Sequence, residues 1–96
     1  MSDQVPVLAP CEVPRRVLGI RIRRSGQDVL LGFEDNALLL EGAGALIYRA
    51  VDGTRSVGVL ARLLAHEYGI EEEEALADVS DFLADLTAQK IIEFSP

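Results

Sequence analysis

The sequence predicts an α+β domain in which a three-stranded antiparallel sheet is followed by three helices, with winged-helix-like proportions. Three observations predict this fold. Apolar runs of strand length, separated by turn residues, fill the first half of the chain. Apolar residues at spacings of three and four fill the second half, as in helices that bury one face. The length of 96 residues suits a single domain with one modest core.

The three expected strands are short. Residues 17–24 alternate isoleucine with arginine, which is the pattern of a strand with one buried face. Ser25-Gly26 forms a turn, and residues 29–33 form a second apolar run. A second turn signal, Glu34-Asp35-Asn36, precedes the short apolar run of residues 37–40. Turns this short predict an antiparallel meander.

Three helices are expected at residues 45–51, 57–68 and 71–90. Glycine follows each of the first two, where a left-handed residue commonly closes a helix. Ser56 is a suitable N-cap for the second helix. The third helix starts with four glutamates and has a lysine near its end, which suits the helix dipole. The apolar residues that follow it are expected to pack on the core: Ile91, Ile92 and Phe94.

The two ends of the chain are expected to differ in order. Residues 1–14 carry Pro6, Pro10 and Pro14 without an apolar period, so we expect an extended N-terminal arm. Residues 15–96 hold all the expected strands and helices and are expected to form the folded domain.

The last helix presents two stripes of side chains. Its apolar stripe predicts a buried face, and its acidic stripe predicts a charged one. Like charges at helical spacing repel each other by roughly a few tenths of a kcal/mol per pair. The acidic stripe is therefore expected to face either bulk water or a basic partner. The apolar stripe is Leu76, Val79, Leu83 and Leu86, and the acidic stripe is Glu74, Asp78, Asp81 and Asp85.

The net charge of −7 is unevenly spread along the chain. Residues 1–24 hold five arginines and two acids, whereas residues 25–96 hold four basic and fourteen acidic residues. A net-acidic surface repels phosphate backbones, so we expect no nucleic-acid partner. The arginines are expected either to keep the domain soluble or to pair with its own acidic helix.

The sequence has no apolar run of transmembrane length and no signal peptide, so we expect a cytoplasmic protein without membrane contact. Cys11 and His66 are the single cysteine and histidine, so neither a disulfide within the chain nor a metal site built on them is expected. Asp78, Asp81 and Asp85 share one solvated face with no partner group for acid–base chemistry. We therefore expect a binding protein without catalysis, metal or cofactor.

The third apolar run, Leu38, Leu39 and Leu40, has no further strand after it in sequence. At a sheet edge, its free backbone groups would accept an added strand. No lysine or proline in residues 37–40 protects such an edge. A peptide or a second copy of the chain could pair there, which leaves a monomer and an edge-paired dimer open. The alternative is that the run is central in the sheet or is covered by the N-terminal arm.

Several motifs together resemble the PqqD-like family, whose members are called RiPP recognition elements. These modules bind the leader of the precursor in the biosynthesis of ribosomally synthesised and post-translationally modified peptides (RiPPs). After the three strands, the residues that carry the resemblance are, in order, Gly44-Ala45-Leu46-Ile47-Tyr48, the link Asp52-Gly53-Thr54-Arg55-Ser56-Val57, Tyr68 and the helix pattern DV-x-x-FL-x-x-L of residues 78–86. The resemblance covers residues 17–92, and Glu41-Gly42-Ala43-Gly44 departs from the N-x-T/S-A/G element often found at that place.

The resemblance implies that residues 15–96 form a PqqD-like peptide-binding domain, with the sheet packed on the three helices. The leader would add as a strand to the third strand, and the third helix would form the other wall of its groove. Aspartates of that helix would meet lysine, arginine or hydroxyl groups of the leader. The implied binding residues are Leu38, Leu39 and Leu40 on the strand, and Ala75, Asp78, Val79, Asp81, Phe82 and Asp85 on the helix.

The resulting hypothesis is a non-catalytic protein that presents a precursor peptide to a separate RiPP modifying enzyme or leader peptidase. A lasso-peptide pathway or another PqqD-dependent pathway would use it. The first alternative is a winged-helix regulatory or DNA-binding domain, but the second helix offers only Arg62 as a basic contact. An acyl-carrier-like protein is a weaker alternative, because its serine belongs at a helix start and Ser80 lies in mid-helix.

Overall fold

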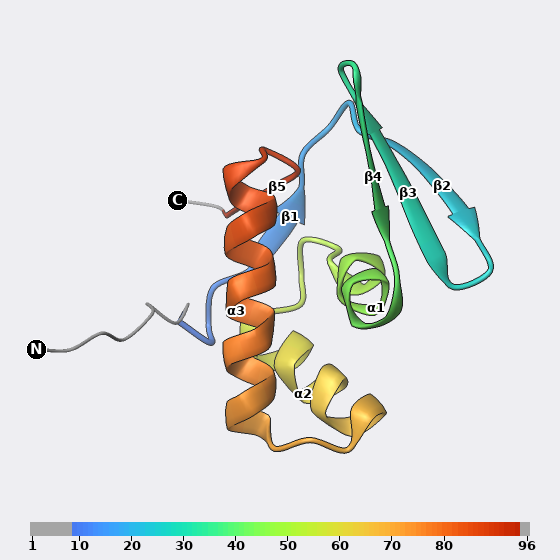
Figure 1. The fold of residues 1–96 in the computed structure, drawn as a ribbon. Helices are drawn as coiled ribbons and strands as arrows, with labels where there is room; N and C mark the ends of the chain where they lie inside the picture. The colour runs from blue at the N-terminus through green and yellow to red at the C-terminus, as the bar shows by residue number, and fades with distance from the viewer. Residues whose placement is uncertain (1–8, 95–96) are drawn as a thin grey trace, which may run out of the picture.

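A computed structural model of the chain describes residues 9–94 and places them in an α+β fold (Figure 1). The prediction of a three-stranded antiparallel sheet followed by three helices is confirmed. The helices are α1 (Gly42–Ala50), α2 (Val57–Tyr68) and α3 (Glu72–Ala88). The strands are β1 (Pro14–Arg16), β2 (Arg21–Ser25), β3 (Asp28–Phe33), β4 (Asn36–Leu40) and β5 (Ile92–Phe94).

The main sheet has the strand order β2-β3-β4, with both pairs antiparallel. Two-residue turns join the strands, because Ser25 pairs with Asp28 and Phe33 pairs with Asn36. Gly26 and Glu34 take the left-handed backbone that such tight turns need, with φ of +63° and +53°. On the inner face of the sheet, side chains of the central strand β3 enter the core: Val29 and Leu31.

The first predicted strand was too long, since β2 begins at Arg21 rather than at Val17. The backbone N–H of Val17 donates to the carbonyl of Ile91 at 3.0 Å, so this residue is held beside the C-terminal strand instead. Gly19, with φ of +93°, then breaks the extended conformation before β2 starts. Residues 17–20 are therefore a link between two sheets.

A second, two-stranded sheet, formed by β1 and β5, was not predicted. Pro14, Arg15 and Arg16 lie antiparallel to Phe94, Glu93 and Ile92. The guanidinium of Arg15 pairs with the carboxylate of Glu93 at 2.9 Å. Neither three-residue strand carries a recognisable period, so only the meeting of the two chain ends defines them. The prediction that the residues after the last helix pack on the core is confirmed for Ile91 and Ile92, which are fully buried.

The connections between helices follow the predicted caps. Ser56 accepts a hydrogen bond from the N–H of Val59 at 3.2 Å, and Gly69 closes α2 in the left-handed conformation. In the α1–α2 link, Asp52 accepts from the N–H groups of Thr54 and Arg55 at 2.9 and 3.0 Å. These bonds, together with the Thr54 hydroxyl, lower the pKa of Asp52 to about 2.

The core lies where α1 separates the sheet from the packed pair α2 and α3 (Figure 1). Tyr48 is fully buried there, and burial raises the pKa of its phenol. The guanidinium of Arg16 lies 4.7 Å from the Tyr48 ring centroid and donates to the carbonyls of Tyr48 and Arg49 at the end of α1. No helix within residues 9–94 has the length and apolar character needed to cross a membrane.

Candidate functional site: an open strand edge facing an acidic helix

The two edges of the main sheet differ in chemistry. β3 is central, so β2 and β4 are the edges, and no other strand within residues 9–94 pairs with the free side of β4. β2 carries Arg21, Arg23 and Arg24, and charged side chains of this kind discourage edge-to-edge pairing. β4 carries only asparagine, alanine and leucine, so its edge has no such protection. The alternative of a central third strand is wrong, while residues 1–8 of the predicted arm lie outside the described residues.

The register identifies which backbone groups of β4 are free. A two-residue turn closes on a hydrogen-bonded pair, here Phe33 and Asn36, and hydrogen-bonded pairs then alternate along the ladder. Leu38 and Leu40 therefore bond to β3, whereas the N–H and C=O groups of Ala37 and Leu39 point away from the sheet. An added strand would find alternate donors and acceptors along this edge.

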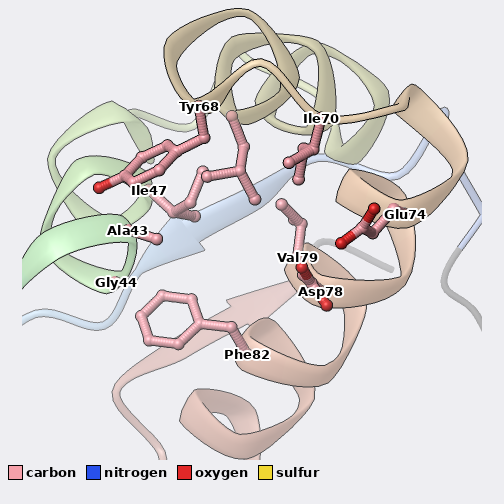
Figure 2. Close-up of a pocket in the computed structure, with 10 residues that line it drawn as sticks. Ala43, Gly44, Ile47, Tyr68, Ile70, Glu74, Asp78, Val79 and Phe82 are labelled. Carbon is pink, nitrogen blue, oxygen red and sulfur yellow. The ribbon is translucent and has the colours of Figure 1, made fainter.

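A cavity of about 360 Å³ opens beyond the Leu40 end of β4 (Figure 2). Most of its lining is apolar and comes from the three helices. Two carboxylates, Glu74 and Asp78, stand on one side of the opening, while Tyr68 and Phe82 stand on the other. The full lining is Ala43, Gly44, Ile47, Leu64, Tyr68, Ile70, Glu74, Asp78, Val79 and Phe82.

Gly44 is the point at which β4, α1 and α3 converge. A Cβ added there would lie 3.2 Å from Cε1 of Phe82 and 4.0 Å from Cδ2 of Leu40. The first distance is shorter than an ordinary van der Waals contact, so glycine allows the Phe82 ring to pack against the start of α1. Phe82 thereby forms a shared wall of the strand edge and the cavity.

The free edge of β4 has a residue of α3 near one end and residues that directly follow α3 near the other. At the Leu40 end, the Phe82 ring and the Leu40 side chain both lie close to Gly44. At the other end, Asn36 lines a second cavity together with Gln89 and Lys90, just after α3. Asp78, Phe82, Asp85 and Gln89 follow one another at spacings of four, three and four, so they share a face of the helix. This stripe and the β4 edge are therefore the candidate sides of a groove.

The helical residues implied by the resemblance fall into three groups: those that line the first cavity, one that is buried in the core, and those that are exposed outside the cavity. Asp78, Val79 and Phe82 line the first cavity, whereas Ala75 is fully buried in the core. Asp85 is exposed between the two ends of the stripe and accepts a hydrogen bond from the side chain of Gln89 at 3.0 Å. Asp81 is exposed and lines neither cavity.

The three leucines of β4 are placed differently. Leu40 is buried on the inner face of the sheet, and Leu38 is half-buried on that face. Leu39 points to the outer face and is 52% exposed. The edge therefore offers backbone groups along its length, with apolar side chains on both faces.

Sequence reasoning missed seven of the ten residues that line the first cavity, since it named only Asp78, Val79 and Phe82. Ala43 and Ile47 come from α1, Tyr68 ends α2, and Ile70 lies in the link between α2 and α3, so the motif of the third helix does not include them. Glu74 had a signal, because it belongs to the predicted acidic stripe. Tyr68, exposed just before the glycine that ends α2, also had a signal, because it is one of the residues that carry the family resemblance.

The arginines of β2 do not pair with the acidic helix. The ion pairs found within residues 9–94 are Arg15 with Glu93 and Arg55 with Asp52, and neither involves β2. Among the same residues, no group of three His, Cys, Asp or Glu side chains could hold a metal ion. The groups that the site presents are free backbone donors and acceptors, apolar side chains and carboxylates.

A strand edge open to pairing, beside an apolar cavity with a carboxylate rim, is the arrangement expected of a small recognition domain. The family described as coenzyme PQQ synthesis protein D (PqqD) matches residues 28–92 of this chain. The chain belongs to the PqqD family.

Individual relatives agree with this assignment. A protein of Rhizobium meliloti (strain 1021) named PqqA binding protein is 28% identical over 96 residues, which cover 97% of each chain. A protein of the same name from Gluconobacter oxydans (strain 621H) is 36% identical over 58 residues, or 60% of each chain.

Two solved structures share the fold. TbiB1 in complex with the TbiA(beta) leader peptide has a TM-score of 0.76 at 16% identity, covering 82% of this chain and 94% of that one. The PqqD truncation of Methylobacterium extorquens PqqCD, described as a functional and stand-alone RiPP recognition element, has a TM-score of 0.72 at 24% identity. That alignment covers 88% of this chain and 93% of the other.

Proposed function

We propose that this chain binds the leader of a ribosomally made precursor peptide as an added strand on β4, against α3. The role is one of affinity and positioning without bond chemistry. The bound precursor is presented to a separate RiPP modifying enzyme or leader peptidase, for which binding raises the effective concentration of the substrate.

The observation that carries the proposal is the unprotected edge of β4. Ala37 and Leu39 direct free backbone groups outward, and proteins normally shield such edges by charge, proline or a covering segment. The cavity beside Phe82 lies where the added strand would leave the sheet, so one apolar side chain of the peptide can be buried there. Main-chain bonds then give affinity, and the cavity gives selectivity.

Charge indicates the kind of leader. Glu74 and Asp78 at the cavity rim and Asp85 on the stripe are carboxylates without an ion pair among the described residues. A leader that places lysine or arginine near its apolar anchor complements this wall, and the attraction speeds encounter more than it deepens affinity. The carboxylates Asp78, Asp81 and Asp85 are all proposed to face the leader, with Asp81 the most peripheral.

The relatives support the same role. Two members of the family are named for binding PqqA, and a chain of the same fold was solved with a leader peptide. We propose PqqA-like precursors as the first substrate class to examine. Lasso-peptide precursors, which the sequence hypothesis also includes, are the second class.

An NMR titration tests the proposal directly. The ¹⁵N-labelled chain is titrated with the leader peptide encoded beside its gene, and with the PqqA of R. meliloti as a second probe. Binding at about micromolar affinity, roughly −8 kcal/mol, is expected to shift the amides of β4 and of residues 78–85. The amides of β2 are the internal control, since that edge is charged and distant from α3. Unchanged β4 and α3 amides at saturating peptide would end the proposal.

No structural observation favours either alternative function, the DNA-binding domain or the acyl-carrier-like protein. α2 offers a nucleic acid only Arg62 and His66, and α3 is acidic along its exposed face, so a gel shift with random duplex DNA at low salt is expected to be negative. Ser80 is only 2% exposed, so a phosphopantetheine group could not be attached there without unfolding the helix.

A further inference from the structure

A second cavity, of about 600 Å³, lies at the opposite end of β4 from the first. Three segments form it: the link of residues 17–20, the β3–β4 turn and the residues that follow α3. In Figure 1 the β3–β4 turn and α1 mark the two ends of β4, so the two cavities bracket the open edge. The lining is Val17, Leu18, Gly19, Ile20, Phe33, Glu34, Asn36, Gln89 and Lys90.

Leu18 is the most exposed large apolar side chain among the described residues. It is 94% exposed, whereas the next such side chain, Leu39, is 52% exposed. The link that carries Leu18 is fixed at both ends, by the Val17–Ile91 hydrogen bond and by the pairing of Arg21 with β3. A fully exposed leucine on a tethered link, at the mouth of a cavity with apolar neighbours, is suited to cover a ligand.

The length of β4 connects this cavity to the groove. Five residues of β4 span about 17 Å at roughly 3.4 Å per residue, so about five peptide residues pair along the edge. The next one or two residues beyond Asn36 then reach the second cavity. Gln89, the C-cap residue of α3, lines this cavity and donates to the carboxylate of Asp85 on the α3 stripe at 3.0 Å, so the stripe leads to the cavity.

We propose that the second cavity is a subsite for the same peptide, and that it holds an apolar side chain under Leu18 just beyond the paired segment. This inference rests on the proposed function, and it adds that the leader carries two apolar anchors separated by about five paired residues. Lys90, which forms no ion pair among the described residues, stands at the rim and favours a carboxylate or carbonyl of the peptide beside the anchor.

The test combines protein variants with shortened peptides. Leu18→Thr removes the apolar cover without disturbing the core, and Leu30→Thr is the control, because that exposed leucine lies on the central strand β3. Affinities for the full leader, and for leaders shortened by three residues from either end, are measured by isothermal titration calorimetry. Leu18→Thr is expected to weaken the full leader about tenfold, and Leu30→Thr less than about twofold.

The shortened leader that lacks the second anchor should bind wild type and Leu18→Thr with equal affinity. A double-mutant cycle then gives a coupling energy between Leu18 and that end of the leader. Equal affinity of wild type and Leu18→Thr for the full leader would overturn the subsite while leaving the β4 groove intact. The same tenfold loss with both shortened leaders would also overturn it.

If Leu18→Thr instead converts a dimer to a monomer in sedimentation without peptide, a second copy covers Leu18 and the subsite is wrong. If no leader binds the wild-type chain, the proposed function fails and the subsite fails with it. NMR gives a second measurement. The full leader should shift the amides of residues 17–20, and only the leader that lacks the second anchor should fail to do so.

Discussion

The two edges of the three-stranded sheet differ in side-chain charge, in burial and in their position relative to α3. The β2 edge carries three arginines, is exposed along its whole length and lies away from the acidic helix. The β4 edge carries leucines, has one face in the core and lies across a groove from α3. Both edges have free backbone groups, so hydrogen-bonding capacity alone does not distinguish them. Side-chain charge and the position of α3 therefore distinguish the β2 edge, which is protected against pairing, from the β4 edge, which we propose as the binding surface.

The arginines of β2 lie outside the proposed groove, so their role must be a different one. Negative charge dominates the rest of the chain, and the arginines of β2 form no ion pair among the described residues. We expect them to repel a second β2 edge, because two copies would bring like charges opposite each other. Pairing with an added strand is then expected at β4 instead.

The largest effect is expected from proline on the open edge. Leu39→Pro removes an outward N–H that β3 does not use, so the ladder stays intact while an incoming strand loses a donor and meets the ring. The leader should bind at least about tenfold more weakly. Ile22→Pro removes an outward N–H from the β2 edge and should leave the affinity unchanged within about twofold. Calorimetry with both variants, and thermal melts as folding controls, checks the pair; equal affinities would remove the distinction between the edges.

The next effect concerns the facing helix. Asp78→Arg reverses a charge at the cavity rim and is expected to weaken the leader by about threefold to tenfold at low salt. Asp81→Arg makes the same change outside both cavities and should cost less than about twofold. Fluorescence anisotropy at two salt concentrations separates charge from packing, since screening reduces the first effect only. Similar losses in both variants would show that total charge, rather than the groove, attracts the leader.

A smaller effect is expected from removing the charges of the β2 edge. The triple variant Arg21→Thr, Arg23→Thr and Arg24→Thr keeps strand propensity and removes the like-charge repulsion. It should self-associate at concentrations at which wild type does not, as sedimentation velocity can measure. Leader binding should persist in the monomeric fraction. A variant that sediments like wild type at every concentration would contradict the protective role of the arginines.

The smallest effect lies away from both edges, at Asp52. Its folded pKa of about 2 is below the ordinary 3.8, so the carboxylate stabilises the fold fully above pH 3.8 and loses this contribution as the pH falls toward 2. Asp52→Asn should lower the urea midpoint at pH 6, and the difference from wild type should shrink below pH 3.8. Leader affinity at neutral pH should not change. A constant difference down to pH 2 would show that the hydrogen bonds do not depend on the charge.

Local sequence was sufficient for most of the fold. The alternation around Ile22 predicted a strand, and the spacing from Leu76 to Leu86 predicted α3, because one-sided burial imposes these periods. Helix ends were also predictable where a side chain forms the cap, as Ser56 does at the start of α2. The β1–β5 sheet was not predictable, because each strand is three residues long and its partner lies at the other end of the chain.

The sequence by itself determined the apolar third strand, the acidic stripe of α3 and the family motifs that link them. It could not decide whether the free side of that strand stays open, since a segment distant in sequence could have paired with it or covered it. Only the tertiary structure brought Leu40 to Phe82 through Gly44, made a cavity from three helices and left Leu18 at a second one. The physical reason is that periodicity reports which face of a segment is buried, whereas a binding groove is made by segments distant in sequence whose contacts have no period.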